Sequence, residues 1–132
     1  MSFTSSGVDI GIVVRDGPAA LAFYVGVLGL HHDGDNPFPN GGVMHRLMAG
    51  ESMVKIVVPE PAPDVAAPSG GIPGATGFRY ITFSIDDLDA MLDACRTAGV
   101  TITRDAVEMI PGVRIALVDD PDGNVVEFLE RR

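Results

Sequence analysis

The feature that most constrains the fold is an internal repeat, because the same order of predicted elements occurs twice along the 132 residues. In each copy, a strand with alternating apolar residues is followed by a helix and then by three further strands. Val14-Arg15-Asp16 aligns with Ile85-Asp86-Asp87, and Lys55 aligns with Glu127, at a nearly constant offset. Sequence identity between the copies is low, but the repeated order predicts two modules of the same architecture.

The predicted bounds follow from hydrophobic periodicity and from residues that start or stop helices. Gly29 and Gly99 end the two helices, and Asp86-Asp87 caps the second. Residues 59–77 are rich in proline, alanine and glycine, which is typical of a linker. The first module has expected strands at 8–14, 30–33, 43–48 and 52–58, a helix at 18–27 and a turn-rich loop at 34–42; the second has strands at 78–85, 100–104, 113–118 and 125–130 and a helix at 88–98.

Each module would bury one face of its sheet under its own helix and leave the other face free. We therefore predict an α+β fold, with one domain over residues 1–132. It consists of two tandem βαβββ modules, 8–58 and 78–130, which form a half-barrel cup around a central cavity. Side chains of alternate residues would point into this cavity. They are Asp9, Gly11 and Val13; Met53, Lys55 and Val57; Phe78, Tyr80, Thr82 and Ser84; Arg114, Ala116 and Val118; and Val125, Glu127 and Leu129.

Charge and composition exclude several classes of protein. The net charge of −9 argues against a nucleic-acid-binding protein, which needs a basic surface. No apolar run reaches the roughly 18 residues of a membrane-spanning helix, and the first residues do not resemble a signal peptide. The single cysteine, Cys95, cannot form an internal disulfide. We expect a cytoplasmic protein with no membrane partner.

The last predicted strand contains an acid that needs a partner. Asp119-Asp120-Pro121-Asp122-Gly123-Asn124 has the residues of a tight turn, and an apolar strand follows it. Glu127 interrupts this strand and points to the face opposite Val126 and Phe128. A carboxylate at a strand centre is costly to bury unless a cation or a hydrogen-bond donor meets it. Lys55 is the first candidate for that partner, and Arg114 is the second.

Two motifs resemble those of the vicinal oxygen chelate superfamily. They are Phe23-Tyr24 followed by Leu28-Gly29-Leu30, and Asp120-Pro121-Asp122-Gly123-Asn124 with Glu127 three residues further on. The resemblance covers residues 8–130. The superfamily includes glyoxalase I, bleomycin-resistance proteins, extradiol dioxygenases and fosfomycin-resistance enzymes, so it implies the fold more specifically than the reaction. It also implies a homodimer that binds a small molecule.

In metal-using members of the superfamily, four inward side chains hold the ion. By position these correspond to Asp9, Lys55, Tyr80 and Glu127, and only Glu127 is of the usual ligand type. Protonated lysine has no lone pair to offer a metal, and neutral tyrosine is a poor ligand. The resemblance therefore implies no resident metal cofactor here, although Asp9 and Glu127 with water remain an alternative divalent-metal site.

The substituted positions have a chemistry of their own. Lys55 would place an ammonium group near Asp9 and Glu127, and Tyr80 could donate a hydrogen bond to a developing oxyanion. These four are the candidate catalytic residues. Arg114, Met53 and Thr82 are candidate substrate-binding residues. The same cluster could instead be only a network of ion pairs.

Three functions stay open. The first is a metal-independent isomerase, lyase, hydrolase or cyclase that acts on an oxygenated metabolite through the four candidate catalytic residues. The second is a binding protein of the bleomycin-resistance type, whose acidity would attract cationic drugs. The third is a divalent-metal glyoxalase or dioxygenase with an unusual ligand set. The histidines have no assigned role: His31 and His32 are expected to be exposed, and His45 packs under the helix if it shares a face with Leu47.

Overall fold

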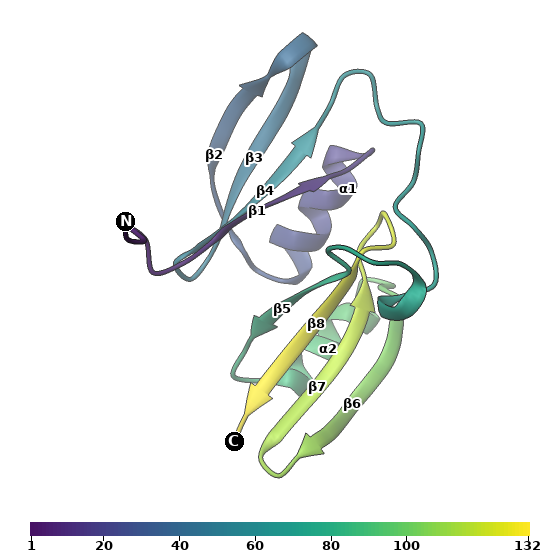
Figure 1. The fold of residues 1–132 in the computed structure, drawn as a ribbon. Coiled ribbons are helices and arrows are strands. Elements are labelled where there is room, and N and C mark those ends of the chain that lie inside the picture. The colour runs from purple at the N-terminus through teal and green to yellow at the C-terminus, as the bar shows by residue number, and fades with distance from the viewer. The chain divides into compact units, whose positions relative to one another are not determined.

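The computed structural model describes all 132 residues, which divide into two compact units, Met1–Val65 and Ala66–Arg132. Each unit contains a four-stranded sheet and a helical segment (Figure 1). The first has β1 (Asp9–Val13), α1 (Gly17–Leu21), η1 (Ala22–Val27), β2 (His31–Phe38), η2 (Pro39–Gly41), β3 (Gly42–Ala49) and β4 (Ser52–Val58); the second has η3 (Ile72–Gly74), β5 (Tyr80–Ser84), α2 (Leu88–Thr97), β6 (Ile102–Ile110), β7 (Val113–Asp119) and β8 (Val125–Arg131).

The two sheets have the same topology, which confirms the predicted repeat. Their strand orders are β1-β4-β3-β2 and β5-β8-β7-β6. In each, the first strand is parallel to the last, and the other neighbours are antiparallel. The aligned residues Asp16 and Asp87 both cap a helix, since their carboxylates accept hydrogen bonds from the backbone N–H groups of Ala19 and Ala90. The α+β fold of two βαβββ modules is thus observed, and each unit is described by itself. The cup around a common cavity stays a prediction.

The helical segment of the first unit changes type along its length. It begins as α1 and continues as the π-helix η1, in which the N–H of Leu28 bonds the carbonyl of Phe23 at 2.9 Å. Phe23 and Tyr24 are buried, and their rings meet edge to face with centroids 4.7 Å apart. Gly29 ends the segment with φ of 82°, as predicted. The first superfamily motif therefore builds the core and the end of this helix. Neither this segment nor α2 is long and apolar enough to cross a membrane.

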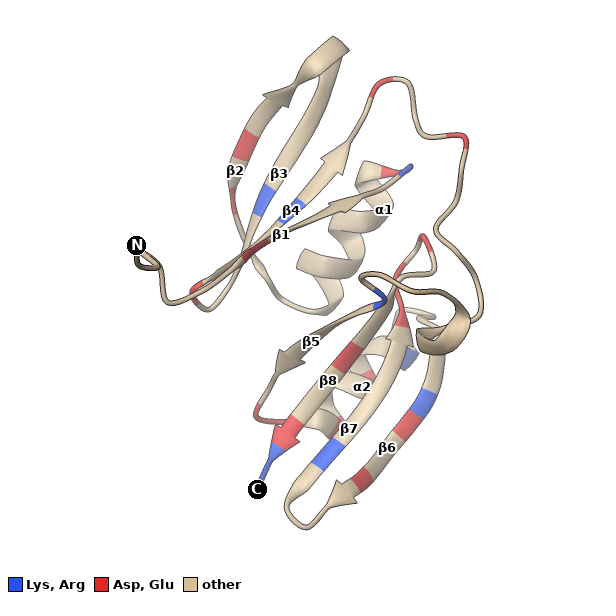
Figure 2. Ribbon diagram, viewed as in Figure 1, with Lys and Arg blue, Asp and Glu red and all other residues tan.

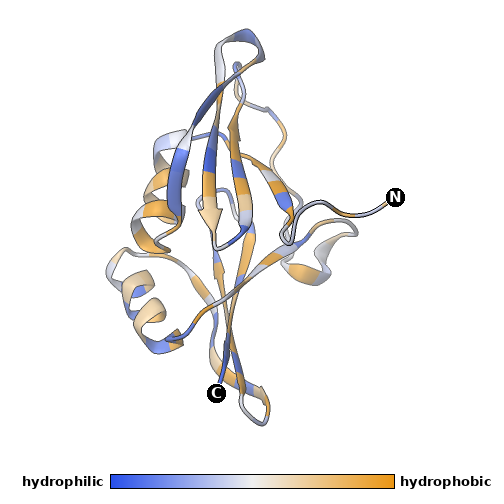
Figure 3. Ribbon diagram, turned by 90° about the vertical axis from the view of Figure 1, so that its left-hand side faces the viewer, coloured by the Kyte–Doolittle hydropathy of each residue, from blue (hydrophilic) through white to orange (hydrophobic).

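Each sheet has a face covered by its helix and an opposite face, which we call the open face. Val54 and Ile56 of β4 and Val126 and Phe128 of β8 are buried on the helix side. The intervening residues, Lys55 and Glu127 among them, lie on the open face and are partly exposed. Along the strands, apolar stretches are interrupted by short polar ones, as the orange and blue bands of Figure 3 show. The prediction of which side chains point away from the helix was correct for β1, β4, β5 and β8.

The prediction for β7 was wrong by one residue. Arg114 pairs with Glu130 across the sheet, and both side chains lie on the helix side, where Arg114 also bonds Asp89 of α2. The buried residues Ala116 and Val118 share this face. The open face of β7 instead carries Ile115 and Leu117, along with Val113 and Asp119. Arg114 therefore cannot be the partner of Glu127, and we do not retain its predicted substrate-binding role.

Two strands extend beyond their predicted ends. β2 runs to Phe38 through most of the predicted loop, and β6 runs to Ile110. Both are edge strands that pair with the next strand as a long hairpin, and the pairing overrides the local turn residues. Their registers shift at β-bulges, one of them between His32 and Gly34.

The predicted linker is not uniform. Its first part belongs to the first unit, and from Ala66 the chain belongs to the second unit. The guanidinium of Arg79 donates hydrogen bonds to the carbonyls of Pro68, Ser69 and Gly71. In the second unit, residues 67–73 therefore form a segment anchored by Arg79 and are not a free linker.

Candidate functional site

The open face of the first sheet carries an ion pair at two superfamily positions. Nζ of Lys55 lies 3.4 Å from Oδ2 of Asp9, and their side chains are 36% and 57% exposed. They are the single charged residues of β4 and β1 (Figure 2). Parallel pairing places Gly11 opposite Lys55 and Asp9 opposite Met53, so the lysine reaches diagonally across the strands. The predicted association of Lys55 with Asp9 is present. At this exposure the pair adds little stability.

The open face of the second sheet carries the other two positions. The hydroxyl of Thr82 donates a hydrogen bond of 2.8 Å to Oε1 of Glu127, its direct partner across the β5–β8 pairing. Tyr80 points to the same face and is half exposed. Glu127 is therefore met by Thr82, a predicted substrate-binding residue, within the unit. A further contact of Glu127 with Lys55 stays a prediction.

A metal ion does not fit this set of donors. The ammonium group of Lys55 has no lone pair to offer a metal, and it engages one of the two carboxylate oxygens of Asp9. The hydroxyl of Thr82 takes an oxygen of Glu127. Tyr80 is a poor ligand for hard divalent ions when neutral. We therefore assign no step of a reaction at these positions to a metal.

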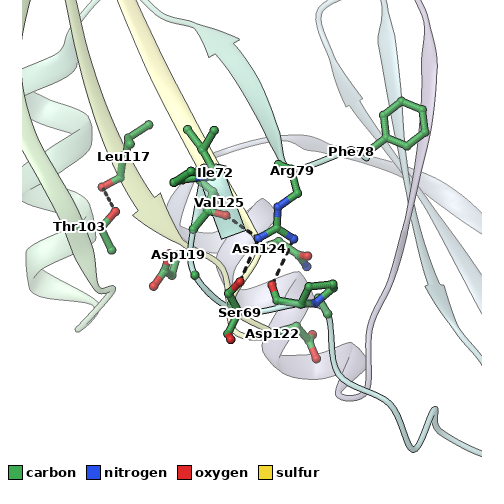
Figure 4. Close-up of a pocket in the computed structure, with 16 residues that line it drawn as sticks. Ser69, Ile72, Phe78, Arg79, Thr103, Leu117, Asp119, Asp122, Asn124 and Val125 are labelled. Carbon is green, nitrogen blue, oxygen red and sulfur yellow. Dashed lines mark hydrogen bonds between the residues drawn. The ribbon is translucent and has the colours of Figure 1, made fainter. Parts of the chain in front are cut away.

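A pocket lies at one end of the second unit's open face and has a volume of about 560 Å³. Figure 4 shows the lining residues, which come from residues 67–73, from the residues just before β5, from β6, β7 and β8, and from the turn before β8. The floor is formed by Leu117 of β7 and Val125 of β8. Leu117 is the cross-strand partner of Glu127, so the pocket adjoins the Thr82–Glu127 pair on one face. It is lined by residues 67–73, by Phe78, Arg79, Thr103, Leu117 and Asp119, and by residues 122–125.

Arg79 holds the segment of residues 67–73 over this pocket. Its guanidinium donates to the three backbone carbonyls of that segment, while its Nε is buried without a hydrogen-bond partner (Figure 4). A buried donor without a partner is uncommon, and a water molecule or a ligand oxygen can satisfy it. Neither the anchoring role of Arg79 nor the pocket was predicted from the sequence, because the segment was interpreted as a linker.

Asp119 supplies an acid to the same pocket. Burial, with a smaller effect from the neighbouring Asp120, raises the pKa of the Asp119 carboxyl above its ordinary value. Such an acid is more readily protonated and can then donate a hydrogen bond to a bound oxygen atom. The adjacent Asp119-Asp120 pair was the sequence signal that could have indicated this environment.

Asp120 belongs to the turn and not to the pocket. Its Oδ1 accepts hydrogen bonds from the backbone N–H groups of Asp122 and Asn124 at 2.9 and 2.8 Å, and its Oδ2 accepts one from Nδ2 of Asn124. Gly123 has φ of 83°. These bonds build the turn that leads from the open-face residue Asp119 into β8. The second superfamily motif thus positions both Glu127 and one edge of the pocket.

The chain belongs to the glyoxalase/bleomycin resistance protein/dioxygenase superfamily, whose family model matches residues 8–128. It is 38% identical over 58 residues to lactoylglutathione lyase of Haemophilus influenzae, a match that covers 43% of each protein. It is 29% identical over 120 residues to CFP32 of Mycobacterium tuberculosis, which is named as a glyoxylase; this covers 89% of the chain and 42% of that relative. The chain thus spans about two-fifths of the length of the curated relatives that it matches.

Solved structures support the same fold. A glyoxalase family protein of Bacillus cereus matches with a TM-score of 0.83 at 16% identity, covering 99% of this chain and 96% of that one. TnmS3, an antibiotic binding protein of Streptomyces, matches with a TM-score of 0.71 at 22% identity, covering 99% and 100%. At these identities the likeness concerns the fold alone.

Proposed function

We propose that this protein binds a small organic molecule in the pocket of the second unit. The observation that carries the proposal is the pocket on the open sheet face, whose volume of about 560 Å³ is within the usual range for small-molecule sites. It combines an apolar floor with a few polar groups, an arrangement that binds and orients such ligands. The name of the similar Streptomyces protein, an antibiotic binding protein, agrees with a role in binding.

The lining indicates the chemistry of the ligand. Leu117 and Val125 suit an apolar or aromatic body, while Asp119 and Arg79 suit oxygen atoms at one end of it. At the other end, a molecule that extends along the open face reaches Thr82 and Glu127. The net charge of −9 favours the approach of a cationic compound over an anionic one.

Binding can be tested by thermal shift with a set of oxygenated metabolites and antibiotics that includes lactoylglutathione and bleomycin. A ligand at 100 times its Kd stabilises the folded protein by about 2.7 kcal/mol, which gives a measurable rise in Tm. Arg79→Met removes the hydrogen bonds that hold residues 67–73, and we expect its affinity for the same compound to be about tenfold lower, or about 1.4 kcal/mol.

The matched control is Arg131→Met, which removes an exposed arginine at the end of β8 and should leave the affinity unchanged. If no compound raises the Tm, or if Arg79→Met binds every compound as well as the wild type, the assignment of the pocket is wrong. Recovery of the bound compound unaltered after long incubation would favour binding without catalysis.

A second candidate function is acid–base catalysis on an oxygenated metabolite, with Asp9, Lys55, Tyr80 and Glu127 as the reacting groups. It is supported by the Lys55–Asp9 ion pair and the Thr82–Glu127 hydrogen bond, which present charged groups on open sheet faces. In this role Lys55 donates a proton or stabilises a developing negative charge, and a carboxylate accepts a proton. The apolar Met53 beside Asp9 would contact the substrate.

For any compound that the protein converts, we expect Lys55→Met to lower kcat by about 100-fold or more, the ordinary contribution of a general acid or base. Lys55→Arg, which keeps the charge but cannot give up its proton, should restore binding more fully than turnover. Unchanged turnover in Lys55→Met would exclude the role.

The homodimer implied by the superfamily also stays a prediction, and sedimentation of the purified chain would test it.

A further inference from the structure

Three side chains on β2 and β3 of the first unit lie close together, outside the candidate sites described above. Oδ1 of Asp35 lies 2.7 Å from Nε2 of His32 and 2.6 Å from Nδ1 of His45. The three ligating atoms all lie within 4.8 Å of one another, and the two imidazole rings meet edge to face. Two imidazoles and one carboxylate are a common ligand set for first-row divalent metals.

A β-bulge brings these residues together. His32 pairs with Leu47 and Gly34 pairs with Arg46, so Asp33 is an extra residue in β2. In a regular strand, residues three apart point to opposite faces. The extra residue changes that parity, and Asp35 consequently comes to lie on the same face as His32. The pattern His-x-x-Asp in the sequence therefore did not indicate a shared site.

The same bulge separates the cluster from the neighbouring cations. The carboxylate of Asp33 lies 3.8 Å from Nε of Arg46 and 3.9 Å from Nε2 of His31. Arg46 is the cross-strand partner of Lys55 and lies with it on the open face. The side chain of Asp35 contacts the two histidines instead.

The position of the cluster provides both anchoring and access. His45 is the direct partner of Asp35 across the β2–β3 pairing, and its side chain is 12% exposed beneath Gly17, the first residue of α1. The side chains of His32 and Asp35 are 33% and 49% exposed. One ligand is therefore held by packing, while the solvent side leaves room for water molecules to complete a coordination shell.

We propose that His32, Asp35 and His45 form a binding site for a divalent metal ion of the zinc, nickel and cobalt type. On binding, Nε2 of His32, Nδ1 of His45 and a carboxylate oxygen of Asp35 offer lone pairs to the ion, and any proton on those nitrogens moves to the other ring nitrogen or to solvent. Ligand atoms of a tetrahedral zinc site are about 3.3 Å apart, as follows from metal–ligand distances of about 2.0–2.1 Å. Small side-chain rotations from the observed separations are enough. The site lies in the first unit, on the helix side of the sheet, and is independent of the pocket proposed above.

The test uses tag-free protein freed of metal with a chelator, and Zn²⁺ alone as the probe. Calorimetry and equilibrium dialysis at neutral pH should show one equivalent bound per chain, and Co²⁺ in its place should give the visible absorption of a low-coordinate site. His32→Gln and Asp35→Asn should each weaken Zn²⁺ binding by about tenfold or more, while far-UV circular dichroism stays unchanged. His45→Gln should do the same, but it also removes a packed side chain.

The matched control is His31→Gln, in which the adjacent histidine, 75% exposed, is replaced on the same strand. It should leave the affinity for Zn²⁺ within about twofold of the wild type. The reason is that His31 pairs with Asp33, which is not part of the cluster. The proposal is overturned if Zn²⁺ shows no saturable binding up to about millimolar concentration. It is also overturned if His32→Gln and Asp35→Asn bind as tightly as His31→Gln.

Discussion

Phe128→Ala is expected to lower the free energy of unfolding by about 3–5 kcal/mol, the usual cost of truncating a buried phenylalanine. Phe128 is fully buried on β8, the strand that lies between β5 and β7. Its cross-strand partners are Phe83 and Ala116, and α2 covers the same face. The side chain therefore contributes to the packing of helix against sheet, and its removal leaves a cavity that the neighbours fill only partly. Urea-induced unfolding followed by circular dichroism measures the loss.

Phe3→Ala is the matched control, since the same atoms are removed from a fully exposed side chain. Its free energy of unfolding should remain within about 0.5 kcal/mol of the wild type. A loss of less than about 1 kcal/mol for Phe128→Ala would contradict the packing of β8 against α2 described above.

Glu130→Gln is expected to lower the Tm by about 5 °C or more at pH 7. Glu130 is a buried acid with several partners: its Oε2 accepts a hydrogen bond of 2.7 Å from the N–H of Leu88, the first residue of α2. Its Oε1 accepts bonds from Arg114 at 3.0 Å and from Arg132 at 2.9 Å. The Leu88 N–H, followed by the two arginines, holds the pKa of Glu130 at about 2, below its ordinary 4.5.

The pH dependence of this effect has a defined sign. A carboxyl whose pKa is lower in the folded state stabilises the protein above its unfolded-state pKa, and the stabilisation is lost as the pH falls through the folded-state pKa. The Tm difference between wild type and Glu130→Gln should therefore be full above about pH 4.5 and should shrink as the pH falls toward about 2. The control is Glu60→Gln, which changes an exposed residue in the segment between β4 and β5. A difference that does not change with pH would contradict the assignment.

Much of the fold could be predicted because local signals agreed with the final packing. The alternation along β4 and β8 placed Lys55 and Glu127 on open faces, and the aligned Asp16 and Asp87 are both N-caps. Two of the expected associations, Lys55 with Asp9 and Thr82 on the face of Glu127, are present because each lies between neighbouring strands of one module.

The remaining features depend on contacts between residues far apart in the sequence. The direction of Arg114 is set by Glu130, which itself faces the helix to cap Leu88, and no periodicity within β7 could reveal that. The pocket depends on hydrogen bonds from Arg79 to backbone carbonyls of residues 68–71. The composition of these residues indicates only a linker and gives no sign of that anchor. The pKa of Asp119 is raised chiefly by burial in the folded chain, with a smaller effect from Asp120.

The extra residue Asp33 has a consequence for comparing this chain with its relatives. Which face His32 presents relative to Asp35 depends on the number of residues between them, and not only on their identities. A relative could therefore retain both histidines and the aspartate yet lose the cluster through a single deletion in β2. Conversely, a one-residue insertion in an otherwise regular edge strand could create such a cluster from residues already present. Gaps in an alignment of this strand are therefore as informative as substitutions.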